Sequence, residues 1–284
     1  MGKLVFFVSV FFVSVSIIGL SGCKRNAKVV DNPITFDSLL LAETYYLNSD
    51  PEQPSCNLQV NFVYPKEYKD KKILGKMQIL FIDKVFGKNY IDQTPEIALQ
   101  NYKDSYIENF KQFERRTGES DFLENDEMKD ETGFSYYKKL KNSIPFSKNN
   151  IISLLVESNI YEGGAHGSHS IYGYVFDLTQ GSFIMEQHIF TENYKKPLSS
   201  IIRAKITKAN DLKEPRELEE IGYGSIEDIV PNGNFIIDKE GITYYFNENE
   251  IASYFMGITT VFIPYREIMN YLRKDSPVGK LAGL

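Results

Sequence analysis

Apolar positions recur along the chain with two different periods. Residues 57–64 are rich in valine, leucine and phenylalanine and are followed by Pro65, which predicts a strand. Between residues 73 and 85 the apolar positions recur every three or four residues and stop before Gly87, which predicts a helix ended by glycine. Residues 94–96 supply a capping hydroxyl, a proline and an acid, so a second helix is predicted to begin there.

The second half of the chain is dominated by strand patterns. Residues 134–146 and 151–161 predict an antiparallel pair joined by a turn at 147–150. Further strands are predicted at 172–178, 182–185, 235–238, 242–246 and 259–263, and further helices at 194–208, 214–221 and 265–272. Since strands and helices come in mixed clusters without regular β-α-β alternation, the pattern predicts an α+β fold.

These elements divide the chain into five predicted segments. They are a signal peptide (1–22), a tether (23–54), a small N-terminal α+β domain (55–149), a C-terminal α+β domain with an antiparallel sheet (150–275) and a tail (276–284). The tether is predicted because residues 24–54 mix polar side chains with one short apolar patch and three prolines.

The N-terminus predicts export. Lys3 precedes an apolar run at residues 4–20 that contains no charge, which is typical of a secretory signal. Leu20-Ser21-Gly22-Cys23 resembles a bacterial lipobox, so Cys23 is the predicted lipid attachment site. The mature protein would then be held on a membrane of the bacterial cell envelope, at its periplasmic face or at the cell surface. An uncleaved anchor is the alternative, because the run just reaches the length that spans a bilayer.

Composition narrows the class of protein. With 42% hydrophobic and 25% charged residues in 284, the chain is expected to fold as a globular protein. The net charge of −6 argues against nucleic-acid binding and favours cationic partners. If Cys23 carries lipid, Cys56 has no partner for an internal disulfide and is expected to be buried as a small apolar residue.

All three histidines, His166, His169 and His188, fall in one short span, with Glu162 and Asp177 close in sequence. This clustering raises the hypothesis of a metal or acid-base site. The glycines around His166 disfavour a helix, and on a strand His166 and His169 would point to opposite faces. The alternative is a tight turn in which His166 bonds a backbone group and His169 is exposed.

No known catalytic motif supports an enzyme. The sequence contains no GxSxG, HExxH or GxxxxGK[ST] pattern, so no catalytic residue, metal or cofactor is predicted.

Two stretches resemble the RsiV-like domain family of unknown function. The first is Tyr161-Glu162-Gly163-Gly164-Ala165-His166-Gly167, followed by the block at 176–181. The second comprises the blocks at 235–242, 246–252 and 263–265, with Gly257 between them. The resemblance covers about residues 150–275, and residues 56–146 resemble the smaller α+β domain that often precedes it.

The resemblance implies an envelope module that recognises a ligand. The member that gives the family its name is a membrane anti-sigma factor whose outer domain binds lysozyme, and another relative carries the module before a peptidoglycan deacetylase domain. Neither a sigma-binding segment nor a deacetylase domain is expected in this chain. The candidate ligand-binding residues are Tyr161, Glu162, Gly163, Gly164, His166 and His169.

The leading hypothesis is a non-catalytic lipoprotein that binds a wall component such as peptidoglycan, or a basic protein such as lysozyme. A cell-wall hydrolase or metal site built on residues 162–188 is one alternative. A structural lipoprotein of an envelope assembly is another. The sequence predicts no particular oligomeric state.

Overall fold

The computed structural model describes residues 30–118 and 135–284, with side chains for 30–112 and 135–284. The predicted signal peptide and Cys23 lie outside the described residues. Within the described part, none of the helices combines the length and apolar character needed to cross a membrane.

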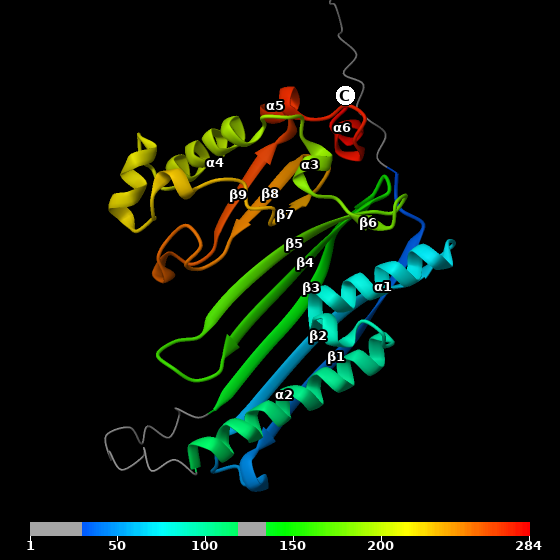
Figure 1. Cartoon of the computed structure of the whole chain (residues 1–284), viewed down its shortest axis with the longest axis vertical. Coiled ribbons are helices and arrows are strands. Elements are labelled where there is room, and N and C mark those ends of the chain that lie inside the picture. The colour runs from blue at the N-terminus through cyan, green and yellow to red at the C-terminus, as the bar shows by residue number, and fades with distance from the viewer. Residues whose placement is uncertain (1–29, 119–134) are drawn as a thin grey trace, which may run out of the picture.

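Six strands form the larger sheet, in the order β1-β2-β3-β4-β5-β6 (Figure 1). They are β1 (Ile34–Tyr46), β2 (Ser55–Tyr68), β3 (Tyr136–Lys148), β4 (Ile151–Tyr161), β5 (Ser168–Asp177) and β6 (Ser182–Phe183). Strands β2 and β3 are parallel and every other neighbouring pair is antiparallel. The parallel pair requires a long connection, which the two N-terminal helices supply.

The two predicted N-terminal helices are confirmed as α1 (Lys71–Phe86) and α2 (Pro95–Gly118). Helix α1 is capped by the Asp70 carboxylate and ends at Gly87, whose φ is 97°. At the start of α2 the backbone N–H of Ile97 donates to the Thr94 hydroxyl at 3.4 Å, as the capping pattern predicts. These local signals therefore set both helix boundaries.

The prediction that residues 23–54 form a tether is partly wrong, because β1 lies inside that segment. Along β1, Leu39 and Leu41 pack against the helix-side core, whereas Leu40 is 75% exposed. This is the alternation of an edge strand with one buried face. The consecutive leucines hide that alternation in the sequence, so the strand was not expected.

The predicted hairpin of β3 and β4 is confirmed. Its two turn residues, Asn149 and Asn150, have φ values of 54° and 63°. Asparagine tolerates this left-handed conformation, which a two-residue hairpin turn requires. The domain boundary expected after residue 149 falls at this turn, and strands from both sides of it share the larger sheet.

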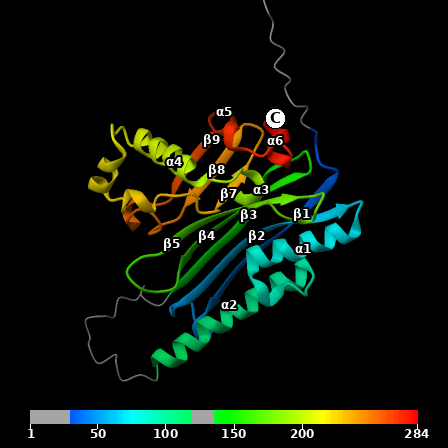
Figure 2. The ribbon, with the colours of Figure 1, turned by 45° about the horizontal axis from the view of Figure 1, so that its top comes forward.

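A smaller antiparallel sheet, in the order β7-β8-β9, lies on the other side of the larger sheet from α1 and α2 (Figure 2). Its strands are β7 (Phe235–Ile237), β8 (Gly241–Phe246) and β9 (Thr259–Pro264). The remaining α-helices are α3 (Glu186–Ile189), α4 (Lys195–Ala209), α5 (Tyr265–Ile268) and α6 (Pro277–Leu281). The short 3-10 helices are η1 (Leu47–Ser49), η2 (Lys88–Tyr90), η5 (Pro215–Ile221), η6 (Ile226–Asp228), η7 (Tyr254–Met256) and η8 (Met269–Tyr271). The predicted α+β class is confirmed.

The molecule has two hydrophobic cores on opposite faces of the larger sheet. Ile152 and Phe176 belong to the core under α1 and α2, as does Cys56, which is 1% exposed as predicted. Their chain neighbours Ile151 and Val175 belong to the core under the smaller sheet. Since successive side chains of a strand point to opposite faces, the larger sheet separates the two cores.

The prediction that residues 276–284 form a tail is also wrong. Ser276 caps α6 by accepting from the Gly279 N–H at 2.8 Å, and Pro277 occupies the first turn. Val278 and Leu281 are buried in the core under the smaller sheet. The segment is therefore a packed helix, which its short length concealed.

Buried tyrosines make stability sensitive to alkaline pH. Burial raises the pKa of Tyr174 to about 12, and burial raises the pKa of Tyr265 and Tyr106 above the ordinary value of 10.0. The folded state therefore keeps protons that the unfolded state loses at pH 10.0. We expect their contribution to the free energy of unfolding to be fully present below pH 10.0 and to fall as the pH rises further.

Absorbance of tyrosinate, followed together with circular dichroism, measures this effect. The buried tyrosines should ionise only as the secondary structure is lost, after the exposed ones. Complete ionisation with intact circular dichroism would contradict the prediction.

Candidate functional site

The glycine-histidine loop connects β4 to β5 at residues 162–167. Gly163 and Gly164 have φ values of 87° and 94°, which most other residues avoid. A Cβ atom at Gly167 would lie 2.8 Å from the carbonyl oxygen of Ile160. The Tyr161 hydroxyl donates to the Gly164 carbonyl at 3.0 Å, so the loop closes on itself.

His166 is held by neighbours on both sides. Its ring stacks on that of Tyr254, with 3.9 Å between ring centroids, and its Nδ1 lies 3.1 Å from the Gly167 carbonyl oxygen. The Tyr254 hydroxyl donates to the same carbonyl at 3.0 Å. The backbone contact predicted for His166 is thus confirmed, and Tyr254 is a partner that sequence reasoning missed. The ring and the neighbouring Glu162 remain exposed.

The outer edge of β5 is closed by side chains from the C-terminal segment. The N–H groups of His169 and Ile171 donate to Glu248 Oε2 at 2.9 Å and Asn247 Oδ1 at 2.7 Å. The Gly173 N–H donates to Asn234 Oδ1 at 2.7 Å. Three edge groups that another strand could have paired are therefore satisfied within the chain. We call these three bonds the edge contacts.

The edge contacts join β5, which lies between the two blocks of the first family-like stretch, to residues in and beside the second stretch. The loop after β4 and the segment after β8 are about 80 residues apart in sequence, as the His169–Glu248 separation of 79 shows. His169 is half-buried by this arrangement and not exposed as expected. Because Gly173 meets the backbone of Phe235, the approach of the two segments is close.

An open groove crosses the part of the larger sheet that the smaller sheet leaves uncovered. Its volume is about 610 Å³. Its lining includes Leu40 and Ala42 of β1, Gln59 and Asn61 of β2, Lys139 and Lys141 of β3, Glu157 and Asn159 of β4, and His169 of β5. These residues alternate with the buried ones along each strand, so they share the face opposite α1 and α2.

The groove has an uncompensated positive charge. Lys141 pairs with Glu157, with 2.8 Å between Nζ and Oε2. In the described part of the chain, Lys139 forms no ion pair, and it is exposed. Its neighbours in register are Gln59 on β2 and Asn159 on β4. A free ammonium between two amides can bind a carboxylate and the polar groups around it.

Two aromatic rings extend this face beyond the groove. Tyr137 and Tyr161 lie opposite each other on β3 and β4, and their ring centroids are 6.0 Å apart in a stacked arrangement. Tyr137 is 40% exposed. Of the predicted ligand-binding residues, His169 lines the groove and Tyr161 belongs to this pair.

The structure does not bring together the residues of the hypothetical metal or acid-base site. Asp177 lies at the far end of β5 from His169, where its carboxylate accepts from the Thr179 N–H at 2.7 Å. His188 lies in α3, where its Nδ1 accepts from the N–H of the capping residue Met185 at 3.1 Å. Across the described ranges, no three His, Cys, Asp or Glu side chains are grouped so as to hold a metal ion.

Sequence reasoning missed Gln59, Lys139 and Asn159, which are the polar groups at the middle of the groove. The signal was present in β3, where Lys139 and Lys141 flank Leu140. That alternation shows a solvated face. It does not show which strands lie beside it.

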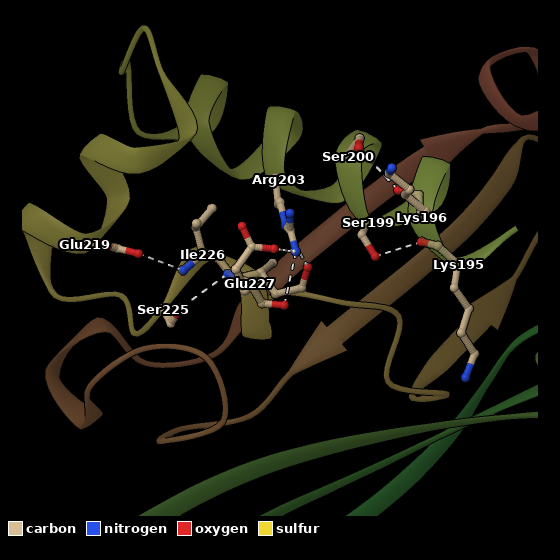
Figure 3. A network of polar contacts seen from close by, with 10 residues as sticks. Lys195, Lys196, Ser199, Ser200, Arg203, Glu219, Ser225, Ile226 and Glu227 are labelled. Carbon is tan, nitrogen blue, oxygen red and sulfur yellow. Dashed lines mark hydrogen bonds and ion pairs between the residues drawn. The ribbon is translucent and has the colours of Figure 1, made fainter.

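An acidic segment projects beside α4. Its carboxylates are Glu214, Glu217, Glu219, Glu220, Glu227 and Asp228. Arg203 of α4 holds it by donating to the carbonyl oxygens of Ile229 at 3.1 Å and Glu227 at 3.0 Å (Figure 3). The Glu219 carboxylate accepts from the Ile226 N–H at 2.9 Å, so the segment is also tied internally.

Comparison with known proteins identifies a domain without a known function. Residues 187–266 match the profile of the family described as Protein of unknown function (DUF3298). This range contains the three side-chain acceptors of the edge contacts and Tyr254. No curated protein matches the chain.

Solved structures that are similar to the chain include two proteins of the DUF3298 family. A member of the DUF3298 family from Bacteroides fragilis NCTC 9343 is 29% identical, with a TM-score of 0.81 over 90% of this chain and 100% of its own. A DUF3298 family protein from Pseudomonas aeruginosa PAO1 is 13% identical, with a TM-score of 0.59 over 86% of this chain and 96% of its own. The second likeness is one of fold alone.

Proposed function

We propose that this protein is an exported lipoprotein of the bacterial envelope that binds a carboxylate-bearing wall component, such as a peptidoglycan fragment, without catalysis. The binding site is the groove on the open face of the larger sheet. The observation that carries the proposal is Lys139, an ammonium that has no ion-pair partner among the described residues and lies in a groove of about 610 Å³.

The chemistry of the groove fits such a ligand. A peptidoglycan fragment presents peptide carboxylates, which Lys139 can bind by charge-assisted hydrogen bonds. It also presents hydroxyl and acetamido groups, which the side-chain amides of Gln59 and Asn159 can pair with as both donors and acceptors. The exposed face of Tyr137 can pack against a sugar ring. All these groups lie on one face of three adjacent strands.

The N-terminal sequence supports the envelope location. The charge-free run at residues 4–20 and the lipobox ending at Cys23 are typical of bacterial lipoproteins. The resemblance to the RsiV-like family also supports an envelope module. Mass spectrometry of the mature protein tests this part, and we expect an acylated Cys23 as its first residue.

Titration calorimetry tests the binding site. The protein lacking the lipid should bind a soluble muropeptide with free peptide carboxylates. Replacing the charged hydrogen-bond donor in Lys139→Met should weaken binding about tenfold or more, since such bonds contribute roughly 1.5–3 kcal/mol. Lys239→Met is the matched control, because Lys239 is 66% exposed on the β7–β8 turn and lies outside the groove.

A second titration uses the same muropeptide with its carboxylates amidated. It should bind wild type and Lys139→Met equally weakly. If the amidated and free fragments bind wild type alike, or if Lys139→Met changes nothing, the groove is not a carboxylate site.

A basic protein such as lysozyme is the second candidate ligand. The acidic segment beside α4 favours it, because six carboxylates within residues 214–228 attract a cationic partner. The triple variant Glu214→Gln, Glu220→Gln, Asp228→Asn should then abolish binding that is strong at low salt and weak at high salt. Absence of lysozyme binding at low salt would eliminate this candidate and leave the groove proposal untouched.

A further inference from the structure

A second cavity lies between α1, the β5–β6 hairpin and α3, and its volume is about 310 Å³. It shares no lining residue with the groove. Val175, Phe183 and Phe235 give it apolar walls. Its size falls at the small end of ligand pockets, which suits a molecule of about ten to fifteen heavy atoms.

One wall of this cavity carries a buried carboxylate without a counterion. Glu186 is 8% exposed. The Tyr194 hydroxyl donates to its Oε2 at 2.8 Å and the Gly233 N–H donates to its Oε1 at 3.1 Å. Within the described residues, Glu186 forms no ion pair. Buried charges are normally paired, so a cation is the group that this wall lacks.

The surroundings of Glu186 reinforce this conclusion. Burial, and then the Glu186 charge, raises the pKa of Tyr244 well above its ordinary value. The Tyr244 hydroxyl is fully buried and lies beside the Glu186 carboxylate. Hydroxyl and amide groups therefore surround the Glu186 carboxylate, and among the described residues no cation does.

The cavity also has a cationic wall. The Lys84 ammonium lies 5.3 Å from the ring centroids of both Tyr174 and Phe183. It bonds the Asp83 carboxylate at 2.9 Å, and the Lys84 side chain is 27% exposed. The aromatic rings and Asp83 hold the ammonium in place, and its three N–H donors leave capacity for a second carboxylate.

We propose that this cavity binds a small amino acid with an apolar side chain. The ligand ammonium is the counterion of Glu186, its carboxylate accepts from Lys84, and its side chain lies against Phe183 and Phe235. An amine without a carboxylate, or an acid without an amine, would satisfy only one of the two charged walls. The site is independent of the proposed groove function.

Calorimetry with three probes tests the proposal: phenylalanine, 2-phenylethylamine and 3-phenylpropionate. Each truncated probe loses one charged contact. We therefore expect the dissociation constant of phenylalanine to be lower than that of either truncated probe by a factor of about ten or more. No binding of phenylalanine, or equal binding of the amine and phenylalanine, would overturn the proposal.

Two variants locate the site. Glu186→Gln should reduce phenylalanine binding to about the level of 3-phenylpropionate, and Lys84→Met should reduce it to about the level of 2-phenylethylamine. Glu192→Gln is the control, because Glu192 is exposed and does not line this cavity. If Glu186→Gln fails to fold by circular dichroism, Lys84→Met alone decides, and unchanged phenylalanine binding in that variant would refute the site.

Discussion

Gly173→Ala is expected to destabilise the fold by about 3 kcal/mol, at the upper end of the cost of overpacking a core. The added Cβ would lie 2.6 Å from the carbonyl carbon and oxygen of Phe235. Backbone atoms cannot move aside as a flexible side chain can. The variant should therefore push β7 away from β5 and break the edge contact between Gly173 and Asn234.

Chemical denaturation measures the effect, with Gly75→Ala as the matched control. Gly75 lies within α1, and a Cβ there meets nothing within 4 Å. Alanine is the better helix former, so this control should gain about 0.5–1 kcal/mol. Equal stability of the two variants would mean that β5 and β7 do not approach as closely as described.

Asn142→Ala should also cost about 3 kcal/mol, because it removes both hydrogen bonds of a buried amide. Asn142 is 3% exposed. Its Oδ1 accepts from the Val63 N–H at 2.9 Å, and its Nδ2 donates to the Val63 carbonyl at 2.8 Å. Each backbone group left unsatisfied costs roughly 1–3 kcal/mol.

This amide continues the pairing of β2 with β3 after the backbone register ends at Asn61 and Lys141. Asn61→Ala is the control for the same denaturation experiment, since Asn61 is exposed on the groove side of β2. Its stability should stay within about 0.5 kcal/mol of wild type. If Asn142→Ala is equally neutral, the side chain does not hold the two parallel strands together.

Elements governed by local chemistry could be predicted from the sequence. The Thr94 cap, the glycine at 87 and the two asparagines at 149–150 each act on residues a few positions away. Their effects are visible in any short window of sequence, and the structure confirms all three boundaries.

Features that depend on distant pairing could not be predicted in this way. The groove needs Gln59 beside Lys139 and Lys139 beside Asn159, and the first of these pairings depends on the long connection through α1 and α2. The edge contacts likewise join residues separated by 61 to 79 positions. The three clustered histidines were misleading, because the chain carries them to three different elements: His166 lies in the loop after β4, His169 on β5 and His188 in α3.

Lysine footprinting with and without a muropeptide tests whether the ligand binds on the open face of the larger sheet. Acetylation rates of all lysines are compared by mass spectrometry in the intact folded protein. We expect strong protection of Lys139, weaker protection of its neighbour Lys141 and no protection of Lys239. Unchanged reactivity of Lys139 at saturating muropeptide would contradict it.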